Sequence, residues 1–231
     1  MGEISIDPKF NIHETYKKVR ILNPYRNSNS KYDFGKALSF DGVDDFANIT
    51  PLTDSSFTIS FWVKFKNIAD RGHSPVMGSL NVSGNVIGFF NNYRLDFNIG
   101  SSGRFTIPTI SVNNWYHFML THNTNSSRVF INGVESLSGT ITGTQELSRL
   151  DLLGRQASIR YANIDLDDLV IKKGYVGTPQ DAIDLYNGVD PSTILTNPDR
   201  WYKFNGNGND SGTDASNLTL NNFIADPYVA H

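Results

Sequence analysis

The chain has 231 residues, no cysteine, a formal net charge of −3 and 39% hydrophobic residues, which suits one large sandwich or two small domains. The absence of cysteine excludes a disulfide framework and a cysteine-ligated zinc site. The basic residues are scattered and no apolar run approaches ~18 residues, so neither a nucleic-acid surface nor a membrane span is predicted.

Residues 1–35 are expected to form an N-terminal arm or linker, and residues 36–231 a sandwich domain. Short apolar pairs alternate with polar stretches in the arm, and residues 27–30 have the composition of a linker. The arm is either a frayed terminus or a segment that orders on a partner. The first residues have no basic or apolar leader pattern, so no signal peptide is expected.

Residues 57–66 predict a long antiparallel strand that is buried on one face. Five apolar side chains alternate with Thr58, Ser60, Lys64 and similar polar residues. Trp62 is the exception on the polar face, so it is either covered by another layer or faces a ligand.

A second long strand is predicted at residues 115–122, apolar on both faces and therefore central. Asn132 and Gly133 separate two alternating runs, a pattern typical of a tight hairpin, because both turn residues need positive φ. Further strands are expected at 37–40, 45–49, 85–90, 93–99, 103–107, 149–153 and 166–172.

One short helix is predicted at residues 178–186. Thr178 is the expected N-cap, Pro179 occupies the first helical position, and Asp181 completes a near-capping box. Many short strands with one helix predict an all-β, two-sheet antiparallel sandwich and not an α/β fold.

Four segments in the same order resemble the laminin-G-like, concanavalin A-like jelly-roll family: residues 35–46, 57–66, 114–117 and 166–171 followed by the helix. The resemblance implies a jelly-roll sandwich. Residues 201–212 look like a segment that precedes the first strand in many members of the family. We therefore expect a permuted layout, in which residues 201–204 and 217–220 return to pair with early strands.

Catalysis is not expected. The resemblance includes glycoside hydrolases with three acidic residues at alternate positions of one strand, and the nearest match here is Asn163, Asp165 and Asp167. Asn163 stands where the nucleophile would be, and an amide cannot replace a carboxylate. His117 and His122 fall on opposite faces of their strand, so they do not predict a joint metal site or a catalytic pair.

Structural calcium is the predicted cofactor. Asp41, Asp44 and Asp45 lie in one tight segment, and clustered carboxylates suit Ca²⁺. The resemblance implies that Asp167 approaches this segment and joins the site. The alternative is that these aspartates are turn residues and backbone caps.

A glycan site is predicted at loop-edge aromatic residues, because sugar rings pack on aromatic faces while their hydroxyl groups need polar partners. The expected ligand-binding residues are Tyr93 with Asn91, and Tyr161 with Asn163. The alternative for any single aromatic residue is packing in the sheets.

The first functional hypothesis is a non-catalytic phage virion protein, a capsid decoration or tail-fibre protein. The arm would bind other virion proteins, the sandwich would bind host glycans, and a homotrimer is the preferred oligomer. The expected location is the virion, with an extracellular location as the alternative. The second hypothesis is a carbohydrate-binding module of a secreted adhesin or glycoside hydrolase.

Overall fold

The computed structural model describes residues 35–67, 74–81, 85–90, 94–100, 102–124, 126–136, 138–142, 145–157, 160–223 and 226–231. Residues 1–34 of the predicted arm, and Asn91 and Tyr93 of the predicted glycan site, lie outside these residues. No helix in the described part of the chain is long and apolar enough to cross a membrane.

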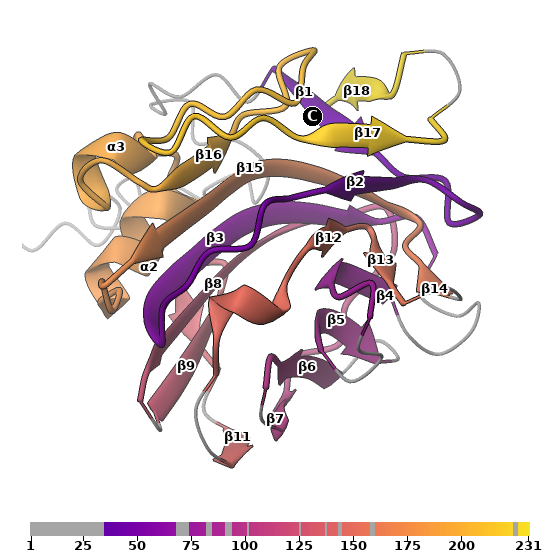
Figure 1. Ribbon diagram of the computed structural model, residues 1–231. Helices are drawn as coiled ribbons and strands as arrows, with labels where there is room; N and C mark the ends of the chain where they lie inside the picture. The colour runs from indigo at the N-terminus through magenta and orange to yellow at the C-terminus, as the bar shows by residue number, and fades with distance from the viewer. Residues whose placement is uncertain are drawn as a thin grey trace, which may run out of the picture.

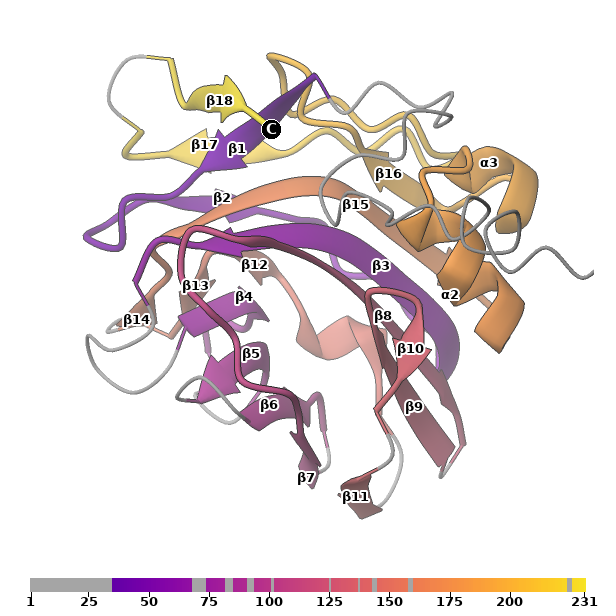
Figure 2. The ribbon, with the colours of Figure 1, turned by 180° about the vertical axis from the view of Figure 1, so that it is seen from behind.

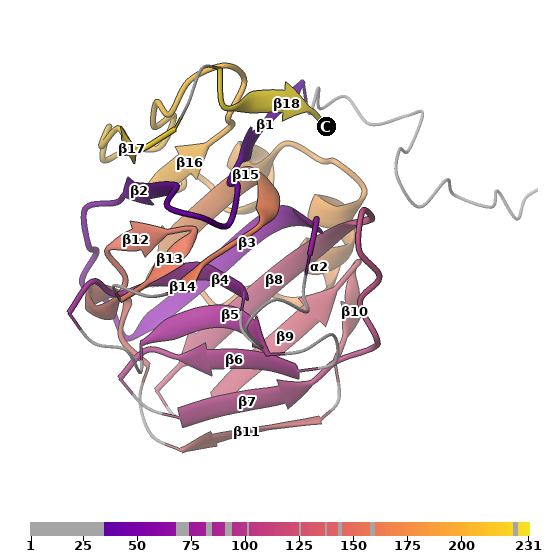
Figure 3. The same cartoon turned by 90° about the vertical axis from the view of Figure 1, so that its right-hand side faces the viewer.

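Two antiparallel sheets stack face to face, as the sequence predicts (Figures 1 and 3). The strands of the first sheet are β1 (Lys36–Ser39), β3 (Ser56–Phe65), β8 (Trp115–Asn123), β9 (Ser126–Ile131), β10 (Val134–Glu135), β15 (Ile164–Lys173), β16 (Arg200–Tyr202) and β18 (Tyr228–Ala230). Their order is β10-β9-β8-β3-β15-β1-β18, and β16 also pairs with β15.

The second sheet has the order β11-β7-β6-β5-β4-β12-β2-β17. Its strands are β2 (Phe46–Asn48), β4 (Ser74–Gly78), β5 (Val86–Phe90), β6 (Arg94–Asn98), β7 (Ser102–Thr106), β11 (Ser138–Thr142), β12 (Leu152–Leu153) and β17 (Thr219–Asn221). A separate two-stranded ribbon consists of β13 (Arg155–Gln156) and β14 (Arg160–Tyr161).

Phenylalanine side chains fill the space between the sheets. Phe65 of β3 lies 4.5 Å from Phe89 of β5, centroid to centroid, and Phe89 lies 4.8 Å from Phe118 of β8. Both contacts are edge-on, the favoured geometry for aromatic pairs. The alternating residues of β3 therefore join the two sheets into one core.

The polar face of β3 is buried as well, which corrects the prediction of a half-buried strand. The helix α2 (Pro179–Tyr186) and the segment before it cover that face, as Figure 2 shows from behind. Thr58 Oγ1 donates to the carbonyl oxygen of Tyr175, and Trp62 stacks on Tyr186 with ring centroids 5.7 Å apart. The sequence left two options for Trp62, and the structure shows the covered one.

The hairpin and the helix are confirmed in detail. Asn132 and Gly133 have φ values of 51° and 78°. Thr178 caps α2, and a reciprocal capping box with Asp181 is present. The prediction of a single helix was incomplete, because a second short helix, α3 (Pro191–Ile194), and a 3-10 turn (Leu147–Arg149) also form.

The C-terminal segment closes the sandwich, in part as predicted. β17 pairs with the early strand β2, but β16 pairs with β15 and not with an early strand. The ladder between β15 and β3 shifts register between Asp167 and Val170, and Asp168 there has a φ of 48°. β1 pairs with β15 on one side of this bulge and β16 on the other, so they share one edge.

Candidate functional site

A hollow of about 420 Å³ opens at one end of the sandwich. Three segments contribute its walls: the loop after β1, the ends of β3 and β4, and the turn between β14 and β15. Its lining residues are Asp41, Gly42, Val43, Asn67, Ser74, Tyr161 and Asn163. The hollow thus combines one aromatic ring with amide, hydroxyl and carboxylate groups.

Two of the four predicted glycan-binding residues lie together in this hollow. Tyr161 and Asn163 both line it, and both side chains are partly exposed. Asn67 and Ser74 line it too, although the sequence analysis did not select them.

Tyr161 is held from behind by Arg155. The two residues are register partners in the β13–β14 ribbon, and the Arg155 guanidinium carbon lies 5.1 Å from the Tyr161 ring centroid. The same guanidinium lies 4.5 Å from the Phe46 ring, and its Nε donates to the carbonyl oxygen of Ala157 at 2.6 Å. These contacts fix the aromatic ring at the wall of the hollow.

In the loop after β1, the backbone at Gly42 has a conformation that favours glycine. Gly42 has a φ of 79°, and a Cβ atom there would lie 2.8 Å from Cβ of Asn163. Asp41 Oδ1 accepts a hydrogen bond from the backbone N–H of Val43 at 2.7 Å. The loop therefore packs directly against Asn163 and forms one wall with it.

The three predicted calcium ligands of this loop are brought together. Asp41, Asp44 and Asp45 each offer an oxygen, and these atoms all lie within 4.8 Å of one another. Asp45 is only 4% exposed, and its Oδ2 accepts from the backbone N–H of Asp41 at 2.9 Å. Its Oδ1 is buried with no hydrogen-bond partner.

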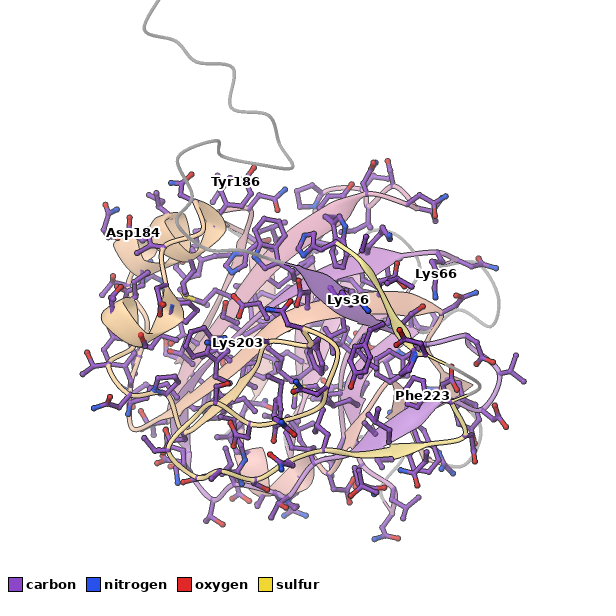
Figure 4. The ribbon with its side chains drawn as sticks, turned by 90° about the horizontal axis from the view of Figure 1, so that it is seen from above. Lys36, Lys66, Asp184, Tyr186, Lys203 and Phe223 are labelled. Carbon is purple, nitrogen blue, oxygen red and sulfur yellow. The ribbon has the colours of Figure 1, made fainter. Side chains whose placement is uncertain are left out.

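This orphaned carboxylate oxygen is the observation that fits a cation. Burial raises the pKa of Asp45, and the charges of Asp41 and Asp44 raise it further, while the hydrogen bond from the Asp41 backbone N–H and, to a smaller extent, the charge of Lys66 oppose the rise. A divalent ion bound by oxygen ligands would offset both effects. Figure 4 labels Lys66 and Phe223 on the same side of the molecule.

The structure places Asp167 apart from these three residues. Asp167 is the register partner of Trp62 and shares its outer face, where its Oδ2 lies 2.5 Å from His231 Nδ1. Asp167 Oδ1 accepts from the backbone N–H of Asp168. The fourth predicted metal ligand is therefore engaged elsewhere.

The other acidic residue of the β15 strand is engaged in ion pairs. Asp165 is 3% exposed and lies 2.7 Å from Lys64 Nζ and 3.2 Å from Lys66 Nζ. His117 and His122 have separate partners: Nε2 of His117 lies 2.8 Å from Ser60 Oγ, and Nδ1 of His122 lies 2.6 Å from Ser127 Oγ.

Comparison with known proteins agrees with this architecture. A family model described as the concanavalin A-like lectin/glucanases superfamily matches residues 41–177. The chain belongs to this superfamily. The match includes every residue that lines the hollow, as well as the three clustered aspartates.

Two solved structures share the superfamily fold with this chain. One is a "putative carbohydrate binding protein" from Bacteroides ovatus ATCC 8483, with a TM-score of 0.64 and 18% identity over 85% of this chain. The chain spans only 60% of that protein's length. The other is a SAP-like pentraxin from Limulus polyphemus, with a TM-score of 0.52 and 11% identity over 85% of this chain and 95% of the pentraxin. No curated protein sequence matches the chain.

Proposed function

We propose that this superfamily member is a non-catalytic carbohydrate-binding domain whose glycan site is the hollow beside Tyr161. The observation that carries the proposal is the convergence of Tyr161 with Asn67 and Asn163 in one concave wall. An aromatic face with amide partners is the combination that a sugar ring requires. The similarity to the Bacteroides ovatus structure, described as a carbohydrate binding protein, supports the same choice.

The charge of the hollow favours a neutral sugar. Among the described residues that line the hollow, Asp41 is acidic and none is a lysine or an arginine. An acidic sugar would meet the Asp41 carboxylate without a compensating cation from these residues. We therefore expect neutral hexoses or pentoses to be preferred in calcium-free buffer.

A glycan array followed by calorimetry on the best ligand tests the proposal. Tyr161→Ala should weaken binding at least about tenfold, which corresponds to ~1.4 kcal/mol. Val134→Ser is the control, because Val134 is 70% exposed on β10, which is at the far edge of the first sheet, and should bind like the parent chain. Equal affinity of Tyr161→Ala and the parent chain would contradict the proposal.

Calcium is the cofactor that we propose for the loop after β1. Asp41, Asp44 and Asp45 would hold the ion, and the ion would stiffen the loop that forms one wall of the hollow. Calcium should raise the thermal midpoint of the parent chain but not that of Asp45→Asn, measured by circular dichroism against EDTA. A thermal midpoint that calcium leaves unchanged in both proteins would contradict calcium binding at this loop.

Hydrolysis is not part of the proposal, because Asp165 pairs with two lysines and Asp167 contacts His231. We expect no turnover of β-glucans. The comparisons provide no link to a phage virion, so the virion location, the anchoring arm and the trimer stay predictions from the sequence. The proposed carbohydrate-binding function depends on none of these three predictions.

A further inference from the structure

A second constellation lies on the outer face of the first sheet, apart from the hollow. Trp62 of β3, Trp115 of β8 and Ala37 of β1 form a buried cluster, and Tyr186 of α2 and Val229 of β18 pack against it. None of these residues lines the hollow. Figure 4 views the molecule from above and labels Tyr186 of α2 and Lys36 of β1.

The imidazole ring of His231 sits in this cluster as a ligand would. It stacks on Trp115 with ring centroids 3.9 Å apart and planes 26° apart, and it meets Trp62 edge-on at 5.7 Å. Its Nδ1 lies 2.5 Å from Asp167 Oδ2. The side chain of His231 is 6% exposed and that of Asp167 is 1% exposed, so the contact is almost fully desolvated.

This combination of groups suits a planar organic cation. Indole faces attract cations within about 6 Å, and more strongly when water is excluded. Burial and the neighbouring Asp168 raise the pKa of Asp167 well above its usual value, so a bound cation would favour its charged form. A protonated imidazole satisfies both requirements, because it donates from Nδ1 and presents a flat cationic ring.

The strand β18, which directly precedes His231, is the edge strand of the first sheet. It pairs with β1 over three residues, and its side chains are partly buried or exposed. The adjacent ion pair between Lys36 and Asp226 is solvent-exposed and therefore weak. Tyr228 packs against the core and Val229 against the tryptophan cluster, and His231 adds the buried contact with Asp167.

We propose that the buried cluster of Trp62, Trp115 and Asp167 is a binding site for imidazolium-type organic cations, and that His231 occupies it as a tethered competitor. The tether gives His231 a high effective concentration at this site. An added cation therefore binds weakly to the parent chain and much more tightly when the His231 ring is removed.

The test uses the full chain with His231→Ala and imidazole as the probe. The readouts are tryptophan fluorescence and the thermal midpoint, at about pH 6, just below the usual imidazole pKa of ~6.5. Imidazole should quench or shift the fluorescence of His231→Ala saturably, with a dissociation constant on the order of millimolar. It should also raise the midpoint by a few degrees, while the parent chain needs at least about tenfold more probe.

Two double variants distinguish binding of imidazole at this cluster from a general effect of imidazole on the solvent. His231→Ala combined with Asp167→Asn should lose the saturable response, and His231→Ala combined with Trp115→Phe should weaken it. Trp201 lies in a different buried cluster, so its emission gives a constant background. A response of equal strength in the parent chain, or one that survives both second substitutions, would overturn the proposal.

Discussion

Asp210 shows how a single buried side chain organises the C-terminal segment. Its Oδ1 accepts from the backbone N–H groups of Trp201 and Gly212 at 2.8 and 2.7 Å, and its Oδ2 from Ser216 at 2.9 Å. The same Oδ2 lies 3.6 Å from Arg200 Nη1, and the Asp210 side chain is fully buried. One carboxylate therefore ties β16 to the turn that follows it.

Asp210→Ala should lower the free energy of unfolding by about 3–5 kcal/mol, because it leaves Arg200 and three amide groups with fewer partners. Urea unfolding followed by circular dichroism measures the change. Asp184→Ala is the matched control: Asp184, labelled in Figure 4, accepts an exposed hydrogen bond from Gln180, and its loss should change stability by less than about 0.5 kcal/mol. A similar loss of unfolding free energy in both variants would show that Asp210 does not stabilise the C-terminal segment more than an exposed aspartate does.

His117 makes stability depend on pH. It is 1% exposed, and burial lowers its pKa from 6.5 to about 3. The unfolded chain therefore takes up the proton first as the pH falls. The stability that this residue contributes is present above about pH 6.5 and is lost toward about pH 3, at up to ~1.4 kcal/mol per pH unit.

Urea unfolding of the parent chain and of His117→Gln, from about pH 7 to about pH 4, measures this effect. Glutamine can still contact Ser60 but does not titrate, so its curve should fall less steeply with decreasing pH. Parallel curves for the two proteins would assign the acid sensitivity to other groups.

At the scale of elements, the predictable parts are those with local causes. The β3 strand follows from its alternation, the hairpin from Asn132 and Gly133, and α2 from its capping residues. The short strands β4, β11, β13, β14 and β18 carried no sequence signal that we recognised. The partner of β16 was missed because the pairing joins two segments that are separate in the sequence. The bulge near Asp168 was missed because a residue other than glycine has positive φ there.

The α2 capping box offers a test at this scale. Thr178 Oγ1 accepts from the Asp181 N–H, and Asp181 Oδ2 accepts from the Thr178 N–H. Thr178→Ala should lower the free energy of unfolding by about 0.5–2 kcal/mol. Trp62 fluorescence should shift to the red below the main unfolding transition, because Tyr186 of α2 covers that indole. Gln180→Ala, at the second and exposed residue of the same helix, should leave both readouts unchanged.

The whole molecule explains what sequence reasoning found at the site and what it missed. Tyr161 and Asn163 were recognisable as an aromatic residue and an amide at the edge of a strand. Asn67 is the second residue after β3, and β3 pairs antiparallel with β15, so the end of one strand lies beside the start of the other. That pairing places Asn67 beside Asn163, and it cannot be read from either segment alone.

Calcium binding also depends on the whole fold. The three aspartates are neighbours in sequence, but the burial of Asp45 arises from the packing around its loop. Asp167 was assigned to the same site because the family resemblance brings the two segments close. The register of β15 instead turns Asp167 to the outer face, beside Trp62 and His231.

The most direct measurement is an amide-resolved NMR titration of the full chain with the best glycan from the array. The account predicts that the largest shift changes fall in residues 41–43, 67, 74 and 161–163, and that Tyr161→Ala abolishes them at the same glycan concentration. Shift changes that centre on the outer face of either sheet, or a pattern unchanged by Tyr161→Ala, would contradict it.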